Sequence, residues 1–168
     1  MVSALSAYYT EASGKASIEN IEINSARLIA KVTTIAAFAY KKSVGQPFVY
    51  PKEDLSYTSN FLNMMFSVPA ESYLLKKEIE NALDLMLILH ADHEQNCSAS
   101  TVRVVGSSKA NVYASVASGI LALWGPLHGG ANQQVVQMLE KILEEGKGIS
   151  KYIEMAKNQK SEFRLMGF

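Results

Sequence analysis

The sequence predicts an all-α protein, and three observations support that prediction. Apolar residues recur at helical spacing through most of the chain. No segment alternates apolar and polar residues over the length of a strand. The breaks between helical segments hold Gly, Pro, Ser or Asn, which end or cap helices. With 168 residues, the chain has the length of one domain and can bury about 70% of its unfolded surface.

Each expected helix is bounded by a loop or a capping residue. Residues 13–20 are polar and residues 43–54 hold Gly45, Pro47 and Pro51, so we expect both segments to be loops. The expected helices cover residues 1–12, 21–42, 55–67, 72–92, from 96 or 98 to 106, 111–123, 127–145 and 149–158. Side chains suited to cap the next helix stand at Ser72, at Asn96 or Ser98, and at Asn111.

The apolar spacing also predicts which helix faces are buried. In the third helix the residues expected to face inward are Phe61, Leu62, Met65 and Phe66. In the fourth helix the expected buried stripe is Leu74, Leu75, Ile79, Ala82 and Leu83, and the expected wet face is Lys76, Lys77, Glu78 and Glu80. Residues 85–89 are apolar on every side, so we expect this helix to end in a core. Small side chains at residues 114–119 predict the close approach of another backbone.

Composition excludes several classes of protein. The 16 basic and 16 acidic residues balance, which argues against a nucleic-acid-binding face. Cys97, the one cysteine, cannot form an internal disulfide, and it fits a reducing compartment. No segment reaches the roughly 20 apolar residues of a membrane span, and the N-terminus lacks the form of a signal peptide. We therefore expect a cytoplasmic protein.

All three histidines lie within residues 87–132. His90 and His93 are one helical turn apart on one face, and acidic residues interleave with them. Because buried charges are costly unless paired, we expect a polar pocket at this helix end. Two histidines at this spacing can share a metal, but a third ligand is required and the His-Glu-x-x-His order of zinc proteases is absent. We expect no metal site.

His128 stands between a Gly-Pro pair and a Gly-Gly pair. Gly ends one helix and Pro favours the first turn of the next, which predicts that His128 lies in that first turn. Free backbone amides there disfavour a protonated imidazole, and a neutral ring can donate a hydrogen bond to a carbonyl oxygen as negative charge develops on it. We expect Gly129 and Gly130 to let a substrate reach the backbone. The alternative is a core histidine with satisfied hydrogen bonds.

Two other reactive residue types have both functional and structural interpretations. Cys97 is either a nucleophile or a packed side chain near an apolar helix. Arg103 either binds a carboxylate or lies on the surface. The Gly129-Gly130 pair is not a dinucleotide fingerprint, since no strand precedes it.

The two histidine segments, residues 87–96 and 124–132, resemble citrate synthase, specifically its hexameric bacterial branch. The resemblance extends over the whole chain, including residues 45–51 and 60–66. It implies a partial large domain at residues 1–145 and the start of a small domain at residues 146–168. It also implies the condensation of acetyl-CoA with oxaloacetate and water to give citrate and CoA in the tricarboxylic acid cycle.

The resemblance assigns roles to individual histidines. His128 matches the catalytic histidine that hydrogen-bonds the acetyl carbonyl of acetyl-CoA and stabilises its enol. His93 matches a histidine that helps to hold oxaloacetate, and His90 matches a supporting position in the same motif. The resemblance implies no cofactor beyond these substrates, and it implies a homo-oligomer, either a dimer or a hexamer, when intact.

A regulatory site is also implied. Tyr9, Arg27 and Lys31 match positions that bind the inhibitor NADH in some hexameric relatives. The alternative interpretation of these residues is a solvated helix face.

The chain departs from the family pattern at its end. The family continues past a segment similar to residues 163–168 into a Gly-His-Arg motif with a second active-site histidine, then an aspartate base and substrate-binding arginines. We therefore expect an incomplete portion of the enzyme with no synthase activity of its own. The alternatives are a 2-methylcitrate synthase, which uses propionyl-CoA, and an inactive assembly or regulatory fragment.

Overall fold

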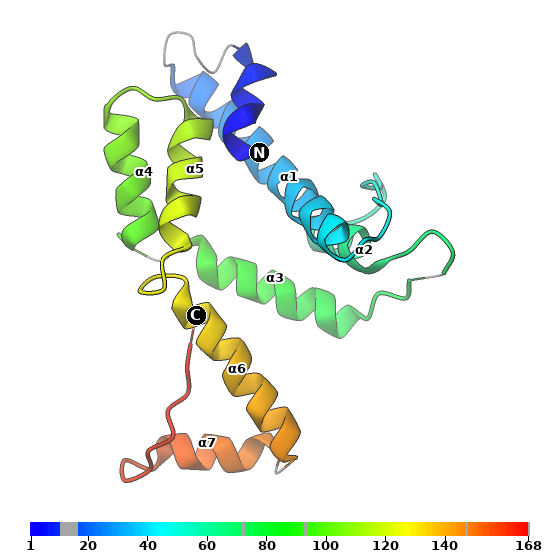
Figure 1. The fold of residues 1–168 in the computed structure, drawn as a ribbon, viewed down its shortest axis with the longest axis vertical. Helices are drawn as coiled ribbons and strands as arrows, with labels where there is room; N and C mark the ends of the chain where they lie inside the picture. The colour runs from blue at the N-terminus through cyan, green and yellow to red at the C-terminus, as the bar shows by residue number, and fades with distance from the viewer. Residues whose placement is uncertain (11–16, 72, 93, 147, 168) are drawn as a thin grey trace.

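The computed structural model describes residues 1–10, 17–71, 73–92, 94–146 and 148–167. Within these ranges the chain is helical, apart from loops and one isolated β-bridge between Val68 and Glu71 (Figure 1), which confirms the all-α prediction. The elements are the 3-10 helix η1 (Val2–Ala7) and the α-helices α1 (Ile18–Ser43), α2 (Tyr57–Phe66), α3 (Lys77–Ala91), α4 (Cys97–Ser107), α5 (Val112–Leu123), α6 (Gly130–Glu145) and α7 (Ile149–Lys157).

Side-chain caps fix where several helices begin. Ser17, Ser56, Asn96 and Asn111 each accept a hydrogen bond from the backbone N–H three residues later, which satisfies one of the unpaired amides of the first turn. At the other end of α6, Gly146 adopts a left-handed conformation with φ +61°, which glycine adopts without a steric penalty.

The helices form an elongated arrangement (Figure 1). η1, α1, α4 and α5 lie together at one end, α2 lies against α1, and α3 leads from α2 towards the start of α4. The core between η1, α1 and α5 centres on Val2, Leu28 and Tyr113, which are buried. α6 and α7 extend away from these helices.

α4 and α5 pack closely because Gly119 has no side chain. A Cβ atom at Gly119 would lie 2.7 Å from Val102 Cγ2 and 3.4 Å from the Ser98 carbonyl oxygen. The prediction of close backbone approach at residues 114–119 is therefore confirmed, and the backbone that approaches is that of α4.

Polar side chains join α2 to α3. Ser56 Oγ donates to Glu80 Oε1 at 2.8 Å, Lys77 Nζ donates to Glu80 Oε2 at 2.8 Å, and the Thr58 hydroxyl donates to Asp84. The hydrogen bond from Lys77, with those from Ser59 and Ser56, lowers the pKa of the Glu80 carboxyl to about 2. Glu80 is thus buried as a carboxylate whose oxygens are paired.

The predicted faces of this region were wrong in part: Lys76, Lys77 and Glu78 are exposed as expected, but other residues are not where they were expected. Glu80 is buried, although it was expected on the wet face, whereas Leu74 and Ile79 are 85% and 47% exposed. α3 begins at Lys77 instead of near Ser72, and Ser72 itself lies outside the described residues. The inner face of α3 meets hydroxyl groups of α2 instead of apolar side chains. In α2, Met64 is buried and Phe66 is exposed, the reverse of the expectation for Phe66.

The apolar run at residues 85–89 is not covered by the described part of the chain. Leu85, Ile88 and Leu89 are 56%, 69% and 65% exposed. Within the described part of the chain, the prediction that this helix ends in a core is therefore wrong, because no described helix packs over the last turns of α3.

Two helix boundaries also differ from the predicted ones. The first helix is the short η1 and ends at Ala7 instead of near residue 12. α1 begins at Ile18, three residues before its predicted start, because the Ser17 side chain caps it.

α6, α7 and the chain after them pack on one another. Tyr152 is buried, its hydroxyl donates to Glu145 Oε2 at 2.6 Å, and its ring lies 5.4 Å from that of Phe163. The Glu145 carboxylate raises the pKa of Tyr152 to about 12. The predicted domain boundary falls at the turn that contains Gly146, and it stays a prediction. Within the described ranges, no helix is both long and apolar enough to cross a membrane.

The Glu80 carboxylate gives a pH-dependent prediction. Its folded-state pKa of about 2 lies below the ordinary value of 4.5, so its stabilising effect is complete above about pH 4.5 and is lost as the pH falls towards 2. We expect Glu80→Gln to lower the urea midpoint at pH 7, measured by circular dichroism at 222 nm, and this difference to close between pH 4.5 and 2. Glu78→Gln, an exposed change on the same helix, is the matched control. A Glu80→Gln difference that persists unchanged at pH 2 would contradict the assignment.

Candidate active site

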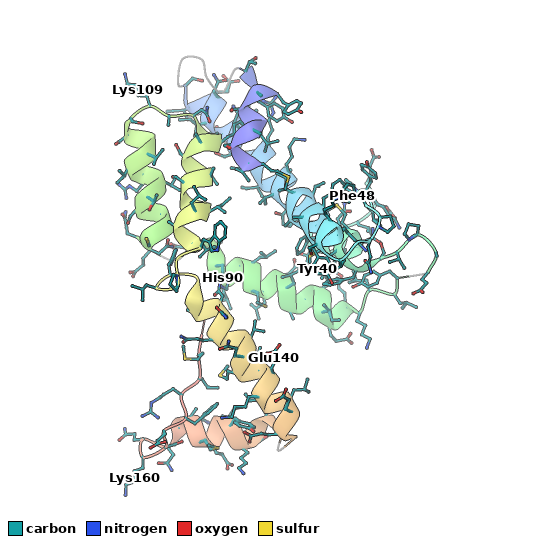
Figure 2. The ribbon with its side chains drawn as sticks, viewed as in Figure 1. Tyr40, Phe48, His90, Lys109, Glu140 and Lys160 are labelled. Atoms are coloured by element: carbon teal, nitrogen blue, oxygen red, sulfur yellow. The ribbon has the colours of Figure 1, made fainter. Side chains whose placement is uncertain are left out.

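Four helix ends meet where the histidines lie. Residues 92–96 join the end of α3 to the start of α4, and residues 124–129 join the end of α5 to the start of α6 (Figure 1). Figure 2 shows His90 at the end of α3 that approaches this region. The two connecting segments therefore hold, or border, all three histidines of the chain.

His128 lies in the turn before α6 and is half-buried. Its backbone N–H and that of Gly129 both donate to the Gly125 carbonyl oxygen, at 3.0 and 2.9 Å. α6 begins only at Gly130, so the prediction that His128 occupies the first turn of that helix is wrong. Residues 125–129 form a separate turn, which brings Gly129 against the Leu123 carbonyl oxygen at the end of α5.

His128 contacts the start of a different helix, α4. The backbone N–H of Ser98, which follows the N-cap residue Asn96 by two positions, donates to His128 Nε2 at 3.3 Å. Because an amide N–H can only donate, Nε2 must act as the acceptor, which places the ring proton on Nδ1. The imidazole in this arrangement is neutral. Its Nδ1–H makes no hydrogen bond to the part of the chain that the structure describes.

The Ser98 side chain supports the same geometry. Ser98 Oγ lies 2.8 Å from His128 Nε2 and 2.8 Å from the Gly119 carbonyl oxygen. Ser98 Oγ donates its single proton to the Gly119 carbonyl oxygen on α5, and it also lies within hydrogen-bond distance of His128 Nε2. Sequence reasoning missed Ser98 as a functional residue and considered it only as a cap. The available signal was its place in the first turn of a capped helix, where backbone amides are unpaired.

Gly129 allows this turn to form. A Cβ atom there would lie 2.1 Å from the Leu123 carbonyl oxygen at the end of α5. Its role is close packing against that carbonyl, which differs from the expected role of admitting a substrate. At Gly130 the nearest atom to an added Cβ is Pro126 Cβ at 4.0 Å, so Gly130 has room, and the expected substrate approach there stays a prediction.

His90 is exposed near the end of α3. Its Nδ1 contacts the Met86 carbonyl oxygen, one turn back, at 2.6 Å. This contact is consistent with Nδ1–H donation and fixes the ring against its own helix. His93 lies outside the described residues, so the predicted pairing of His93 with His90 and His128 stays a prediction. Among the described residues, no group of three or more His, Cys, Asp or Glu side chains is placed to bind a metal ion.

The structure brings together the three residues of the implied regulatory site. Arg27 Cζ lies 4.4 Å and Lys31 Nζ 5.7 Å from the centre of the Tyr9 ring. Tyr9 in turn stacks on Tyr113 of α5, with ring centres 5.9 Å apart and planes at 16°. The cluster adjoins the start of α5, whereas the His128 turn follows its end.

The remaining candidate residues lie on the surface. Cys97 is exposed at the start of α4, so its interpretation as a packed side chain is wrong. Arg103 is exposed on the same helix, in agreement with its surface interpretation.

The comparisons with known proteins converge on one family. The family described as "Citrate synthase, C-terminal domain" matches residues 1–168. The chain is 54% identical over 168 residues to citrate synthase 1 of two strains of Mycobacterium tuberculosis, across 100% of this chain and 39% of that protein.

Solved structures show the same likeness. The crystal structure of citrate synthase from Pyrobaculum aerophilum is similar with a TM-score of 0.69 and 37% identity, over 99% of this chain and 38% of that chain. That of citrate synthase from Thermotoga maritima is similar with a TM-score of 0.63 and 29% identity, over 87% of this chain and 39% of that chain. The chain thus spans about two fifths of the length of these relatives.

The close contact at Gly129 can be tested by substitution. We expect Gly129→Ala to lower the free energy of unfolding by about 1–3 kcal/mol, because its Cβ would collide with a backbone oxygen that has no rotamer to change. Gly130→Ala is the matched control, because space is available there and alanine favours the first turn of α6. Urea unfolding followed by circular dichroism measures both. Equal stability of the two variants would contradict the assigned role of Gly129.

Proposed function

The chain belongs to the citrate synthase family, and from this membership we propose that residues 1–168 supply part of a citrate synthase active site. The reaction is the condensation of acetyl-CoA with oxaloacetate and water to citrate and CoA. One observation carries the proposal. The Ser98 amide holds His128 as a neutral imidazole whose Nδ1–H can be donated to a ligand.

This geometry suits the chemistry of the first step. The α-proton of a thioester is weakly acidic, so a base removes it only if the developing enolate oxygen is stabilised. The His128 Nδ1–H would donate a hydrogen bond to that oxygen, and the Ser98 amide would hold the ring ready to donate. A donor whose position is fixed before reaction needs no reorganisation as charge develops.

We propose that His93 and His90 hold oxaloacetate beside this donor. The support is the chain path, since the end of α3 and the start of α4 are separated only by residues 92–96. A held oxaloacetate turns a random encounter into a positioned reaction.

The proposal extends to the pathway, the cellular location and the assembly of the protein. The protein would act in the tricarboxylic acid cycle in the cytoplasm, as a homo-oligomer, with no metal and no cofactor beyond its substrates. The exposed apolar run at residues 85–89 supports oligomer formation, because soluble monomers rarely leave large contiguous apolar patches uncovered.

A graft tests the proposed activity. Residues 1–168 would replace the matching 39% of Mycobacterium tuberculosis citrate synthase 1, and release of CoA would be followed with DTNB. We expect an active graft in which His128→Gln lowers kcat by about 10²–10³-fold, the usual cost of losing one donor to a developing oxyanion. Ser98→Ala should lower kcat less, since the backbone amide remains. Arg103→Gln, an exposed change on α4, is the control.

The graft also separates the alternatives. Preference for propionyl-CoA over acetyl-CoA would assign the chain to the 2-methylcitrate synthases. A folded graft without activity would favour an assembly or regulatory role and would contradict the proposal, as would an active graft that does not respond to His128→Gln.

We also propose that Tyr9, Arg27 and Lys31 bind NADH as an inhibitor. The supporting observation is that Arg27 and Lys31 of α1 both lie over the ring of Tyr9, which follows η1, and there they can share the phosphates of a dinucleotide. Arginine supplies a planar fork of donors for phosphate oxygens, and lysine supplies a second positive charge.

Calorimetric titration of the chain with NADH tests this site. We expect Arg27→Gln and Lys31→Gln each to weaken binding about tenfold, which corresponds to about 1.4 kcal/mol for each lost contact. Added salt should weaken binding as well, because the contacts are ionic. Lys42→Gln, an equal charge change at the other end of α1, should leave binding unchanged. Binding that is insensitive to Arg27 and Lys31 would place NADH elsewhere.

A further inference from the structure

A closed ring of four side chains ties three elements together beside the cationic pair. Asn24 on α1 is 1% exposed, and its Oδ1 accepts from Tyr113 OH at 2.8 Å and from Arg27 Nη1 at 3.3 Å. Arg27 lies over Tyr9, and Tyr9 stacks on Tyr113, which closes the ring. One amide oxygen is thus shared by a buried tyrosine of α5 and by an arginine at the proposed NADH site.

Asn24 itself cannot easily reorient. Its Nδ2 donates to the Asn20 carbonyl oxygen at 2.7 Å, so rotation of the amide would break this bond together with the two at Oδ1. Tyr113 is fully buried, so a loss of its hydroxyl partner would not be made up by solvent. The Arg27 guanidinium therefore shares one acceptor oxygen with the hydrogen bond that holds the start of α5.

α5 extends from this ring to the His128 turn. Tyr113 and Trp124 are separated by about 16 Å along the helix, at 1.5 Å per residue. Near its far end, Gly119 holds α5 against α4 and its carbonyl oxygen accepts from Ser98, the residue that contacts His128. A displacement of α5 would therefore act on His128 both through the turn and through Ser98.

We propose that Asn24 and Tyr113 are positioning residues that couple the state of Arg27 to α5 and so to the His128 turn. The inference rests on the proposed NADH site for its ligand. An anion that binds the Arg27 guanidinium draws it away from Asn24. The hydrogen bond between Tyr113 and Asn24 then changes its geometry, and α5 moves relative to α4. By linkage, a ligand bound at the His128 turn would change the affinity of the cationic site by the same factor.

The chain carries a natural reporter of this coupling. Trp124 is the single tryptophan and stands at the C-terminal end of α5. Its indole N–H gives one cross-peak in a ¹H–¹⁵N spectrum. We expect NADH to shift this cross-peak in the unmodified chain, and to shift it at least about threefold less in Tyr113→Phe, which keeps the ring stack but loses the hydroxyl. NADH should still bind Tyr113→Phe in the calorimeter.

A double-mutant cycle without ligand tests the coupling independently of the NADH site. Arg27→Met should move the Trp124 cross-peak in the unmodified chain but not in the Tyr113→Phe background. Lys31→Met removes the same charge beside the Tyr9 ring but keeps the Arg27–Asn24 hydrogen bond, so it should leave the peak in place. An Arg27→Met effect that is absent, or equal in both backgrounds, overturns the coupling. If the double-mutant cycle shows the coupling but NADH does not bind, only the proposed NADH site is overturned.

Discussion

The hydrogen bond from the Ser98 amide to His128 Nε2 is the interaction on which the candidate site depends. It needs two separate parts of the chain to be placed at once. Asn96 must cap α4 so that the next amides are free and directed outward, and Gly129 must let the following turn pass under the end of α5. Gly119 brings α4 and α5 close enough for the two parts to meet. The hydrogen bonding of the His128 imidazole therefore depends on Gly119, Gly129 and the Asn96 cap.

Much of the fold follows from local signals in the sequence. Asn96 and Asn111 cap helices as expected, and the loop that contains Gly45, Pro47 and Pro51 separates α1 from α2. These signals act within a few residues, so they can be read without knowledge of the neighbouring elements. The helical class is predictable for the same reason.

The burial of individual faces was harder to predict, because it depends on the partner element. Glu80 is charged and was placed on the outside, but α2 presents Ser56 and Ser59 to it, and Lys77 completes its hydrogen bonds. Periodicity detects where apolar residues recur, but it does not detect a hydroxyl group contributed by another helix. The same limit affected His128, since the sequence indicated a helix N-terminus correctly but assigned α6 instead of α4.

The polar clusters of this chain lie at helix ends, and this arrangement affects how motion can spread. α5 is held at its start by the Tyr113–Asn24 bond and near its end by the contact between Gly119 and Ser98. Between these two points α5 stays close to α4, since a Cβ atom at Gly106 would lie 3.8 Å from Ser115 Oγ. A short rigid helix with directional bonds at both ends transmits a displacement as a whole, because bending it would break its own backbone hydrogen bonds. The histidine turn and the cationic cluster are thus mechanically joined, although they share no side chain.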